Sequence, residues 1–373
     1  MMWREHICTQ LDALRNAHRW REPIVFDGDG IHGTVRDHNV IAFASNDYLG
    51  LSQHPAVRAA AHEAIDRFGA GTGASRLVVG SRSVHAELEA AIAAWKHTDA
   101  ALLFPNGYAA NLGALSALGG PDVTLFSDEL NHASIIDGCR LSRSRVVVYR
   151  HGDMNHLSEL LKTASGRKLI VSDAVFSMDG DMAPLPELVE LCVRHDALLM
   201  LDEAHAVLGP ELLDAPIEMV RMGTLSKALG SLGGWIAGSR DLIDLLINHA
   251  RSFIFTTALS PADTAASLAA LRIYRSPEGD ALRKRLRRNI ERLRADHPSP
   301  IVPWILGDDR AALDAAAHLL SRNIFIPAIR PPTVPQGAAR LRIALSALHT
   351  DEMIDQLLRA LAHPSCTPLA QNN

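Results

Sequence analysis

The sequence predicts an α/β protein with a large, mostly parallel sheet, followed by a smaller α+β domain at the C-terminal end. From about residue 45 onward, short apolar runs rich in β-formers alternate with helical patterns. Such alternation is typical of a parallel sheet with right-handed crossovers. The strand-like runs cover residues 101–104, 123–127, 145–149, 168–172, 197–202, 217–223 and 234–238.

Both ends of the chain depart from this alternation. Residues 3–20 favour an amphipathic helix, and a polar, hairpin-like stretch then leads to a strand at 40–43. The tail mixes both element types, with helices expected at 261–275, 279–296, 309–321 and 350–362 and strands at 301–306, 324–326 and 340–345. We therefore expect an N-terminal arm (1–44), a large α/β domain (45–265) and a small α+β domain (266–373).

The composition is that of an ordinary globular protein. Among 373 residues, 47% are hydrophobic and 21% charged, and 37 basic against 42 acidic residues give a net charge of −5. This balance gives no electrostatic case for binding nucleic acid or an anionic membrane. The four cysteines have no paired or metal-like spacing, and no apolar run approaches the ~18 residues of a membrane span. We expect a cytoplasmic protein without a metal site.

Two motifs near the middle of the chain suit the chemistry of pyridoxal phosphate (PLP). An apolar run ends in Asp202, and a carboxylate at the end of a rigid strand can keep the pyridine nitrogen of PLP protonated. Lys227 follows the next apolar run among small and hydroxylated residues, where its amine can form a Schiff base. His205 can donate a hydrogen bond to the ring oxygen of PLP, and Thr224 can bind its phosphate.

The same residues have other interpretations. The Asp-Glu-Ala-His sequence at 202–205 also occurs in helicases, but those proteins carry a P-loop, and no Gly-x-x-x-x-Gly-Lys-Ser/Thr sequence occurs here. A lone lysine after a strand is most often a solvated surface residue. The joint order and spacing of Asp202, His205 and Lys227 favour the PLP site.

Three more candidates follow predicted strands. Gly107 and Tyr108 open a helix whose free amides can bind a phosphate dianion, although a glycine turn into a core helix would give the same pattern. His132 can stack on a flat ring or cap the next helix. Ser177 can touch the oxygens of a cofactor. A Ser-His-Asp hydrolase is disfavoured because no Gly-x-Ser-x-Gly elbow is present.

A proline-rich loop near the C-terminal end carries arginines on both sides. Residues 329–337 read Ile-Arg-Pro-Pro-Thr-Val-Pro-Gln-Gly, and Arg340 and Arg342 follow. Prolines stiffen the loop, and guanidinium groups bind carboxylates in a bidentate way. The alternative is a surface loop with solvated arginines.

Together these motifs resemble the α-oxoamine synthase family of PLP enzymes over nearly the entire chain. The resemblance implies the aspartate aminotransferase-like fold of PLP-dependent transferases, fold type I. The loop at 330–335 points to the branch of that family in biotin biosynthesis. The shared motifs lie at residues 45–51, 69–76, 131–134, 175–181, 202–205, 224–227, 253–257 and 330–335.

The resemblance also implies a role for each matching residue. Lys227 would hold the cofactor covalently and move protons, Asp202 would pair with the pyridine nitrogen, His205 with the ring oxygen, and His132 would stack on the ring. The rest of the cofactor shell would be Gly107, Tyr108, Ser177 and Thr224, with Thr256 or Thr257 reaching the phosphate of the neighbouring subunit. Substrate contacts would come from Arg21, Asn46, Arg330, Thr333 and Arg342.

For the biotin branch, the resemblance implies a decarboxylative condensation of L-alanine with a pimeloyl thioester of coenzyme A or acyl carrier protein, in a homodimer with shared active sites. The nearest alternative is a glycine-using sister enzyme, such as 2-amino-3-ketobutyrate CoA ligase or 5-aminolevulinate synthase. A non-catalytic protein with the PLP fold is an alternative of another class.

One segment departs from the family pattern. The family continues from the Asp-Glu-Ala-His motif into a glycine-rich segment ending in Gly-Arg-Gly. Here a visibly shorter stretch leads from His205 to Ile217. We expect this gap to lie close to the mouth of the active site and to affect the handling of the acyl donor.

Overall fold

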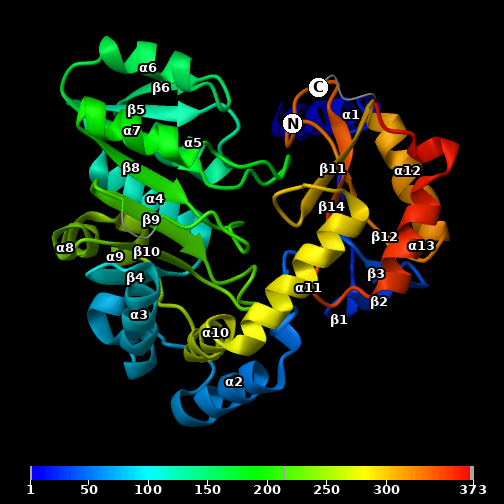
Figure 1. The fold of residues 1–373 in the computed structure, drawn as a ribbon, viewed down its shortest axis with the longest axis horizontal. Coiled ribbons are helices and arrows are strands. Elements are labelled where there is room, and N and C mark those ends of the chain that lie inside the picture. Colours follow the sequence, from blue (N-terminus) through cyan, green and yellow to red (C-terminus); the bar gives the residue numbers. More distant parts are fainter. Residues whose placement is uncertain (1, 213–214, 370–373) are drawn as a thin grey trace. The chain divides into compact units, whose positions relative to one another are not determined.

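The computed structural model describes residues 2–212 and 215–369. The chain divides into two compact units (Figure 1). Unit 1 comprises Met1–Tyr48, Met178–Gly180 and Arg285–Asn373, and unit 2 comprises Leu49–Ser177 and Asp181–Lys284.

Unit 2 is built on a seven-stranded sheet with the strand order β4-β10-β9-β8-β7-β5-β6. Only β10 runs antiparallel to its neighbours, so the prediction of a mostly parallel sheet is confirmed. The strands are β4 (Ala100–Phe104), β5 (Val123–Asp128), β6 (Arg145–Tyr149), β7 (Arg167–Asp173), β8 (Ala197–Asp202), β9 (Met219–Thr224) and β10 (Gly234–Gly238).

Helices cover both faces of this sheet because the central strands are apolar on both sides. Leu169 and Val171 belong to one core and Ile170, between them, to the other. This is the two-residue alternation of a strand buried on both faces. The first core contains side chains of α4 (Gly107–Leu118), α5 (Ala133–Leu141) and α8 (Arg240–His249), and the second those of α6 (Met154–Lys162) and α7 (Leu185–His195).

Further helices complete unit 2. They are η1 (Leu51–Gln53), α2 (Pro55–Phe68), η2 (Arg76–Gly80), α3 (Ser83–Lys96), α9 (Arg251–Ile254) and α10 (Pro261–Tyr274). Helix α11 (Pro277–Leu293) crosses the division between the units at residues 284 and 285. In the part of the chain that the structure describes, no helix is both long and apolar enough to cross a bilayer.

Unit 1 contains two small sheets. The first has the order β1-β2-β3-β12, with strands β1 (Asp27–Asp29), β2 (His32–Val35), β3 (His38–Ala42) and β12 (Ile324–Phe325). The second has the order β11-β14-β13, with strands β11 (Ile301–Gly307), β14 (Ala339–Ala344) and β13 (Ala328–Ile329). The helices of unit 1 are α1 (Met2–Asn16), α12 (Asp309–Ser321), α13 (Asp351–Leu361) and η3 (Pro364–Cys366).

The units do not coincide with the three predicted segments. The arm belongs to the same unit as the C-terminal residues because its backbone pairs with theirs. β3 lies parallel to β12, and the amide of Ala344 donates to the carbonyl of Phe43 at 2.8 Å. The division near the C-terminal side falls inside α11, about 20 residues after the predicted boundary at 265. Pairing between distant segments carries no signal in local composition.

A buried ion cluster braces the sheet of unit 2 behind Asp202. Glu203 is 8% exposed and accepts from Lys96 Nζ at 2.6 Å and from Arg221 Nε at 2.6 Å. Burial alone would raise the pKa of Glu203, but the charges and hydrogen bonds of Lys96 and Arg221 hold that pKa below its ordinary 4.5. Because the folded pKa is lowered, this contribution to stability is present above pH 4.5 and is lost as the pH falls below it.

The substitution Glu203→Gln should lower the free energy of unfolding by about 3–5 kcal/mol, because the buried cations Lys96 and Arg221 then lack a carboxylate partner. Denaturant unfolding near neutral pH measures this change. The matched control is Glu190→Gln, which removes an exposed i,i+4 pair with Arg194 and should cost less than about 1 kcal/mol. Equal effects of the two substitutions would contradict the role assigned to the cluster.

Candidate active site

The candidate site lies where the strands of unit 2 end together. Asp173 at the end of β7 is paired in register with Asp202 at the end of β8, which in turn is paired with Met222 of β9. The parallel strands β5, β7, β8 and β9 share this carboxyl edge, which is where open α/β sheets bind ligands. The register therefore gathers the loops that carry most of the residues predicted for the cofactor.

Asp202 is a buried carboxylate with two fixed donors. Its side chain is 3% exposed and accepts from Asn111 Nδ2 at 2.8 Å and from the Ala204 amide at 2.9 Å. Asn111 also donates to the Ser134 hydroxyl at 2.8 Å. We did not predict Asn111 or Ser134 as site residues. Asn111 lies one helical turn after Gly107, a spacing that could have placed it on the same face of α4.

A second carboxylate, that of Asp173, lies beside Asp202. It is 2% exposed and accepts from the His132 amide at 2.7 Å. Burial, together with the nearby charge of Asp202, raises the pKa of Asp173 well above its usual range. Two neighbouring carboxylates are rarely both ionised when they are buried. The neutral form of Asp173 is therefore favoured.

Lys227 meets His205 directly. Lys227 Nζ lies 2.8 Å from His205 Nε2, and His205 is 4% exposed. Lys227 itself is half-buried in the turn that follows β9, while His205 lies three residues beyond the end of β8. The structure thus brings together the lysine, the histidine and the strand-end acid that the sequence predicted for one site.

His132 caps helix α5 and leaves its ring at the site. Its Nδ1 lies 2.7 Å from the Ser134 hydroxyl and accepts from the Ser134 amide at 3.3 Å. Although the residue is exposed as a whole, local desolvation of the ring lowers its pKa; Lys227 acts in the same direction, and Asp202 opposes it. A neutral ring stacks more readily on an aromatic cofactor than a hydrated imidazolium does. Both sequence interpretations, capping and ring contact, are compatible with this geometry.

The first turn of α4 offers backbone donors at the same edge. The side chain of Asn106 accepts from the Ala109 amide at 2.8 Å, and its carbonyl accepts from Ala110. The amides of Gly107 and Tyr108 come before Ala110, whose amide is the first to reach an acceptor of the helix backbone, so they remain for a ligand. A Cβ at Gly107 would lie 3.0 Å from Met222 Cε, so a larger residue at this position would push the end of the Met222 side chain aside.

These residues fit PLP. The site offers a buried strand-end carboxylate, an amine beside an imidazole, and helix amides for a phosphate. The buried Oδ1 of Asn111 has no partner among the described residues, so the amide that orients Asp202 can still accept a hydrogen bond. Within residues 2–212 and 215–369, no group of three or more His, Cys, Asp or Glu side chains could hold a metal ion.

Four other predicted cofactor residues have distinct environments. The Thr224 hydroxyl donates to the Gly233 carbonyl at 2.8 Å and lies 2.8 Å from the Ser226 hydroxyl, so it sits on the turn that carries Lys227. Ser177 is half-buried in the loop after β7. Thr256 is half-buried and Thr257 exposed after α9, as expected for residues that would serve another subunit.

In unit 1, two predicted substrate residues contact each other. Arg342 of β14 is 8% exposed and donates through Nη2 to Asn46 Oδ1 at 3.1 Å. The Tyr48 hydroxyl donates to the same oxygen at 3.0 Å. Burial raises the pKa of Tyr48, with Arg342 opposing. The side chain of Arg342 is therefore held in one orientation by a polar pair.

The arm and the proline-rich loop bind each other through two arginines. Arg330 donates through Nη2 to the Trp20 carbonyl at 3.1 Å and through Nη1 to the His18 carbonyl. Arg21 donates to the Pro331 carbonyl at 2.9 Å. Burial and the charge of Arg21 lower the pKa of Arg330. Thr333 is exposed in this loop, and its amide donates to the Arg330 carbonyl at 3.1 Å.

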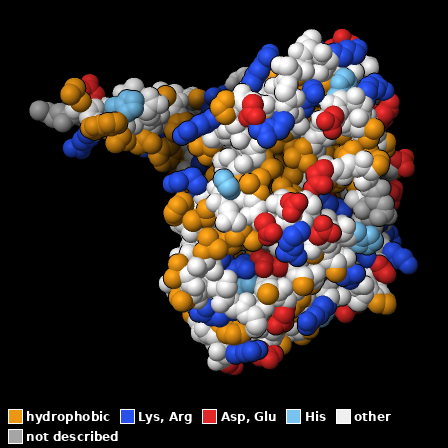
Figure 2. Space-filling model, turned by 90° about the vertical axis from the view of Figure 1, so that its left-hand side faces the viewer, with side chains coloured by type: hydrophobic (Ala, Val, Ile, Leu, Met, Phe, Trp, Pro, Cys, Tyr) orange, Lys and Arg blue, Asp and Glu red, His pale blue; other side chains and the backbone are white. Residues whose placement is uncertain are grey.

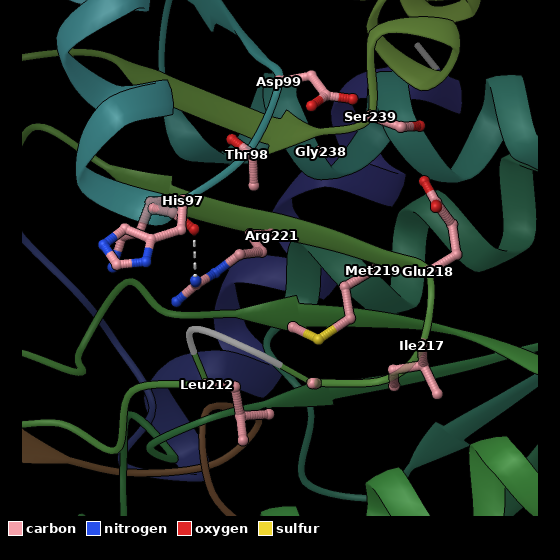
Figure 3. A pocket seen from close by; sticks show the side chains of 12 residues that line it. His97, Thr98, Asp99, Leu212, Ile217, Glu218, Met219, Arg221, Gly238 and Ser239 are labelled. Carbon is pink, nitrogen blue, oxygen red and sulfur yellow. Dashed lines mark hydrogen bonds between the residues drawn. The ribbon is translucent and has the colours of Figure 1, made fainter.

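The shortened segment after His205 leads away from the catalytic edge, because β8 ends at that edge and β9 begins at the opposite one. Figure 3 shows Ile217 and Glu218 beside the start of β9. They line a cavity of about 200 Å³ with Leu212, Ala215 and the buried Arg221, which donates to the Lys96 carbonyl at 3.0 Å. Residues 213 and 214 lie outside the described residues. Ile217 and Glu218 therefore lie towards the edge of the sheet opposite Asp202. The expectation that the gap lies close to the mouth of the site stays a prediction.

Comparison with known proteins supports the motif analysis. Residues 38–361 match the family described as aminotransferase class I and II. The 8-amino-7-oxononanoate synthase of Anaeromyxobacter dehalogenans is 52% identical, over 95% of this chain and 94% of its own. That of Geobacter sulfurreducens is 45% identical, over 95% of this chain and 97% of its own.

Solved structures show the same fold. A serine palmitoyltransferase of S. paucimobilis with a bound PLP–myriocin aldimine is 30% identical, with a TM-score of 0.89 over 95% of each chain. The 8-amino-7-oxononanoate synthase of Francisella tularensis is 28% identical, with a TM-score of 0.73 over 86% of this chain and 96% of its own. The predicted fold type I is thereby confirmed. The chain belongs to the class I and II aminotransferase family and, within it, to the α-oxoamine synthases.

Proposed function

We propose that this chain condenses L-alanine with a pimeloyl thioester, with PLP as cofactor, and releases carbon dioxide, the free thiol and 8-amino-7-oxononanoate. The observation that carries the proposal is the contact of Lys227 with His205 at 2.8 Å beside the buried Asp202. Relatives that are 45–52% identical over 95% of the chain bear the name of this synthase, which supports the choice of substrates.

Each cofactor residue has a distinct task in this proposal. Bound PLP supplies an electron sink that stabilises negative charge at the α-carbon of the amino acid. Asp202, held by Asn111 and the Ala204 amide, presents its charge to the ring nitrogen. The amides of Gly107 and Tyr108, with the hydroxyl of Thr224, bind the phosphate. Ser177 contacts an oxygen of the cofactor.

Lys227 anchors the cofactor and then serves as the base. Its amine, freed when the amino acid takes its place, removes the α-proton and later returns one. His205 lies close enough to orient that amine and to donate to the ring oxygen. His132 packs on the face of the ring. The protein thereby controls which bond at the α-carbon reacts by holding the substrate relative to the ring.

Two ends of the substrates are anionic, and arginines are assigned to them. Arg342, already oriented by Asn46, binds the alanine carboxylate in the proposal. Arg21 and Thr333 contact substrate from the arm and the proline-rich loop. Arg330 donates to two carbonyls of the arm, so binding a second carboxylate would require it to exchange one of these bonds.

Lys227→Ala should abolish product formation and covalent retention of the cofactor. Borohydride reduction of PLP-loaded protein, followed by peptide mass analysis, should place the reduced cofactor on Lys227 in the wild type and nowhere in the variant. Lys284→Ala, at an exposed position, is the matched control and should label normally. Survival of the label in Lys227→Ala would overturn the assignment and favour a non-catalytic protein.

The substrate assignment is tested by comparing alanine and glycine, each with pimeloyl, acetyl and succinyl thioesters. Alanine with a pimeloyl thioester should give the highest kcat/KM, measured by thiol release. Coenzyme A and acyl carrier protein forms of the donor are assayed side by side. Faster turnover of glycine with acetyl or succinyl donors would identify a glycine-using sister enzyme instead.

An exposed apolar patch supports a homodimer as part of the proposal. The π-helical turn η2 presents Leu77, Val78 and Val79 at 52%, 73% and 67% exposure, and Phe255 after α9 is 69% exposed. η2 and α9 contact each other, and Thr256 and Thr257 directly follow Phe255. A second copy packed on this patch would receive the two threonines near its own phosphate site. Contiguous exposed apolar side chains of this kind mark interaction surfaces.

Val79→Asp should therefore shift the protein from dimer to monomer and weaken PLP retention, because a buried unpaired charge opposes the interface. Light scattering coupled to size exclusion measures the mass, and visible absorbance measures retained PLP. Val148→Asp changes an exposed valine of strand β6 and serves as control. A monomeric wild type would contradict the shared site. The cytoplasmic location expected from the sequence stays a prediction.

A further inference from the structure

Beside the proposed PLP site, an imidazole is held between two carboxylates. His151 Nδ1 lies 3.0 Å from Asp128 Oδ1, and His151 Nε2 lies 2.7 Å from Asp181 Oδ2. The ring packs edge-on against Phe176, with centroids 4.4 Å apart. All four residues belong to unit 2, and neither the proposed reaction nor the family motifs assign His151 a role.

Both contacts require the charged form of the ring. A neutral imidazole has one N–H, so one of the two carboxylates would face a lone pair. An imidazolium donates to both. Burial opposes the charge, but the hydrogen bonds and charges of Asp128 and Asp181 raise the pKa of His151 to about 10. The bridge is therefore intact at neutral pH.

The bridge fixes the loop that carries Ser177. Asp128 ends strand β5 and is 3% exposed, so it is a rigid anchor. Phe176 and Asp181 bracket Ser177, and the Phe176 amide donates to the Asp181 carbonyl at 3.0 Å. His151 contacts both residues, Phe176 through the edge-to-face ring contact and Asp181 through Nε2. Loss of the bridge would release the Asp181 end of the loop, which is the end farther along the chain from strand β7.

We propose that His151 is a positioning residue for the cofactor: its cationic ring ties Asp181 to Asp128 and so holds Ser177 where it touches the oxygens of PLP. The inference rests on the proposed function, because it takes the contact between Ser177 and the cofactor from there. The ligand is the bound cofactor, through its oxygen atoms. His151 itself does not touch it and acts through the loop.

The other charged groups near His151, Glu129 and Arg150, make contacts that do not involve its ring nitrogens. The Glu129 carboxylate accepts from the His151 backbone amide at 2.9 Å. Arg150 is paired with Asp153, which caps α6, and the Arg150 amide donates to His156. Within the part of the chain that the structure describes, the hydrogen-bond partners of the His151 ring nitrogens are these two carboxylates.

The test is the dissociation constant of PLP for the full chain, measured by visible absorbance. His151→Asn should weaken PLP binding by about 10- to 100-fold, the loss expected for hydrogen bonds to charged groups. His151→Arg, which keeps the charge and two donors, should recover most of it. His62→Asn, at an exposed histidine of α2, is the control. Thermal unfolding of the apo variants verifies that each one folds; Asp181→Asn replaces His151→Asn if that variant does not.

A double-mutant cycle separates positioning from general destabilisation. If His151 acts through Ser177, the effects of His151→Asn and Ser177→Ala on the dissociation constant are not additive. The double variant then has about the same dissociation constant as whichever single variant binds PLP less tightly. Additive effects, or unchanged affinity in His151→Asn, overturn the inference. Borohydride labelling of Lys227 is run on each variant: labelling that fails in the wild type rejects the proposed function, whereas intact labelling with additive effects rejects the role of His151 alone.

Discussion

The parallel register of the central strands is the constraint on which the site depends. Asp173, Asp202 and Met222 occupy matching positions at the ends of β7, β8 and β9. Each strand end therefore delivers its loop to the same edge, and a one-residue slip would turn every side chain to the opposite face of the sheet. The contact between Lys227 and His205 links loops after two neighbouring strands, so it exists only in this register.

The same register separates the charges of two consecutive acids. Asp202 points to Asn111 at the catalytic edge, whereas Glu203 lies between Lys96 and Arg221. Lys96 and Arg221 hold the Glu203 carboxylate away from the cofactor side. The neutral form favoured for Asp173 removes a second negative charge from that side. In the proposed function, Asp202 faces the pyridine nitrogen, where PLP chemistry requires a negative charge.

Local patterns in the sequence were sufficient for the strands, for the strand-end acid and for the lysine turn, because each depends on residues close together in the chain. Contacts between distant segments left no such signal. Asn111 on Asp202, Asp173 beside Asp202 and the parallel pairing of β3 with β12 each join residues far apart in sequence. The cofactor and substrate roles came from the family motifs, and they stay predictions until variants test them.

The position of the shortened segment explains how the chain can depart from its family without losing the chemistry. Every cofactor residue assigned here, from Gly107 to Lys227, lies at or beyond the carboxyl edge of the sheet in unit 2. The segment begins at that edge with His205, but its later part, including Ile217, lies at the opposite edge beside Arg221. On the face shown in Figure 2, acidic and basic side chains are interspersed around apolar ones, as on an ordinary protein surface. The register that positions Asp202 and Lys227 is set by the strands themselves, so it does not depend on the length of the segment between them.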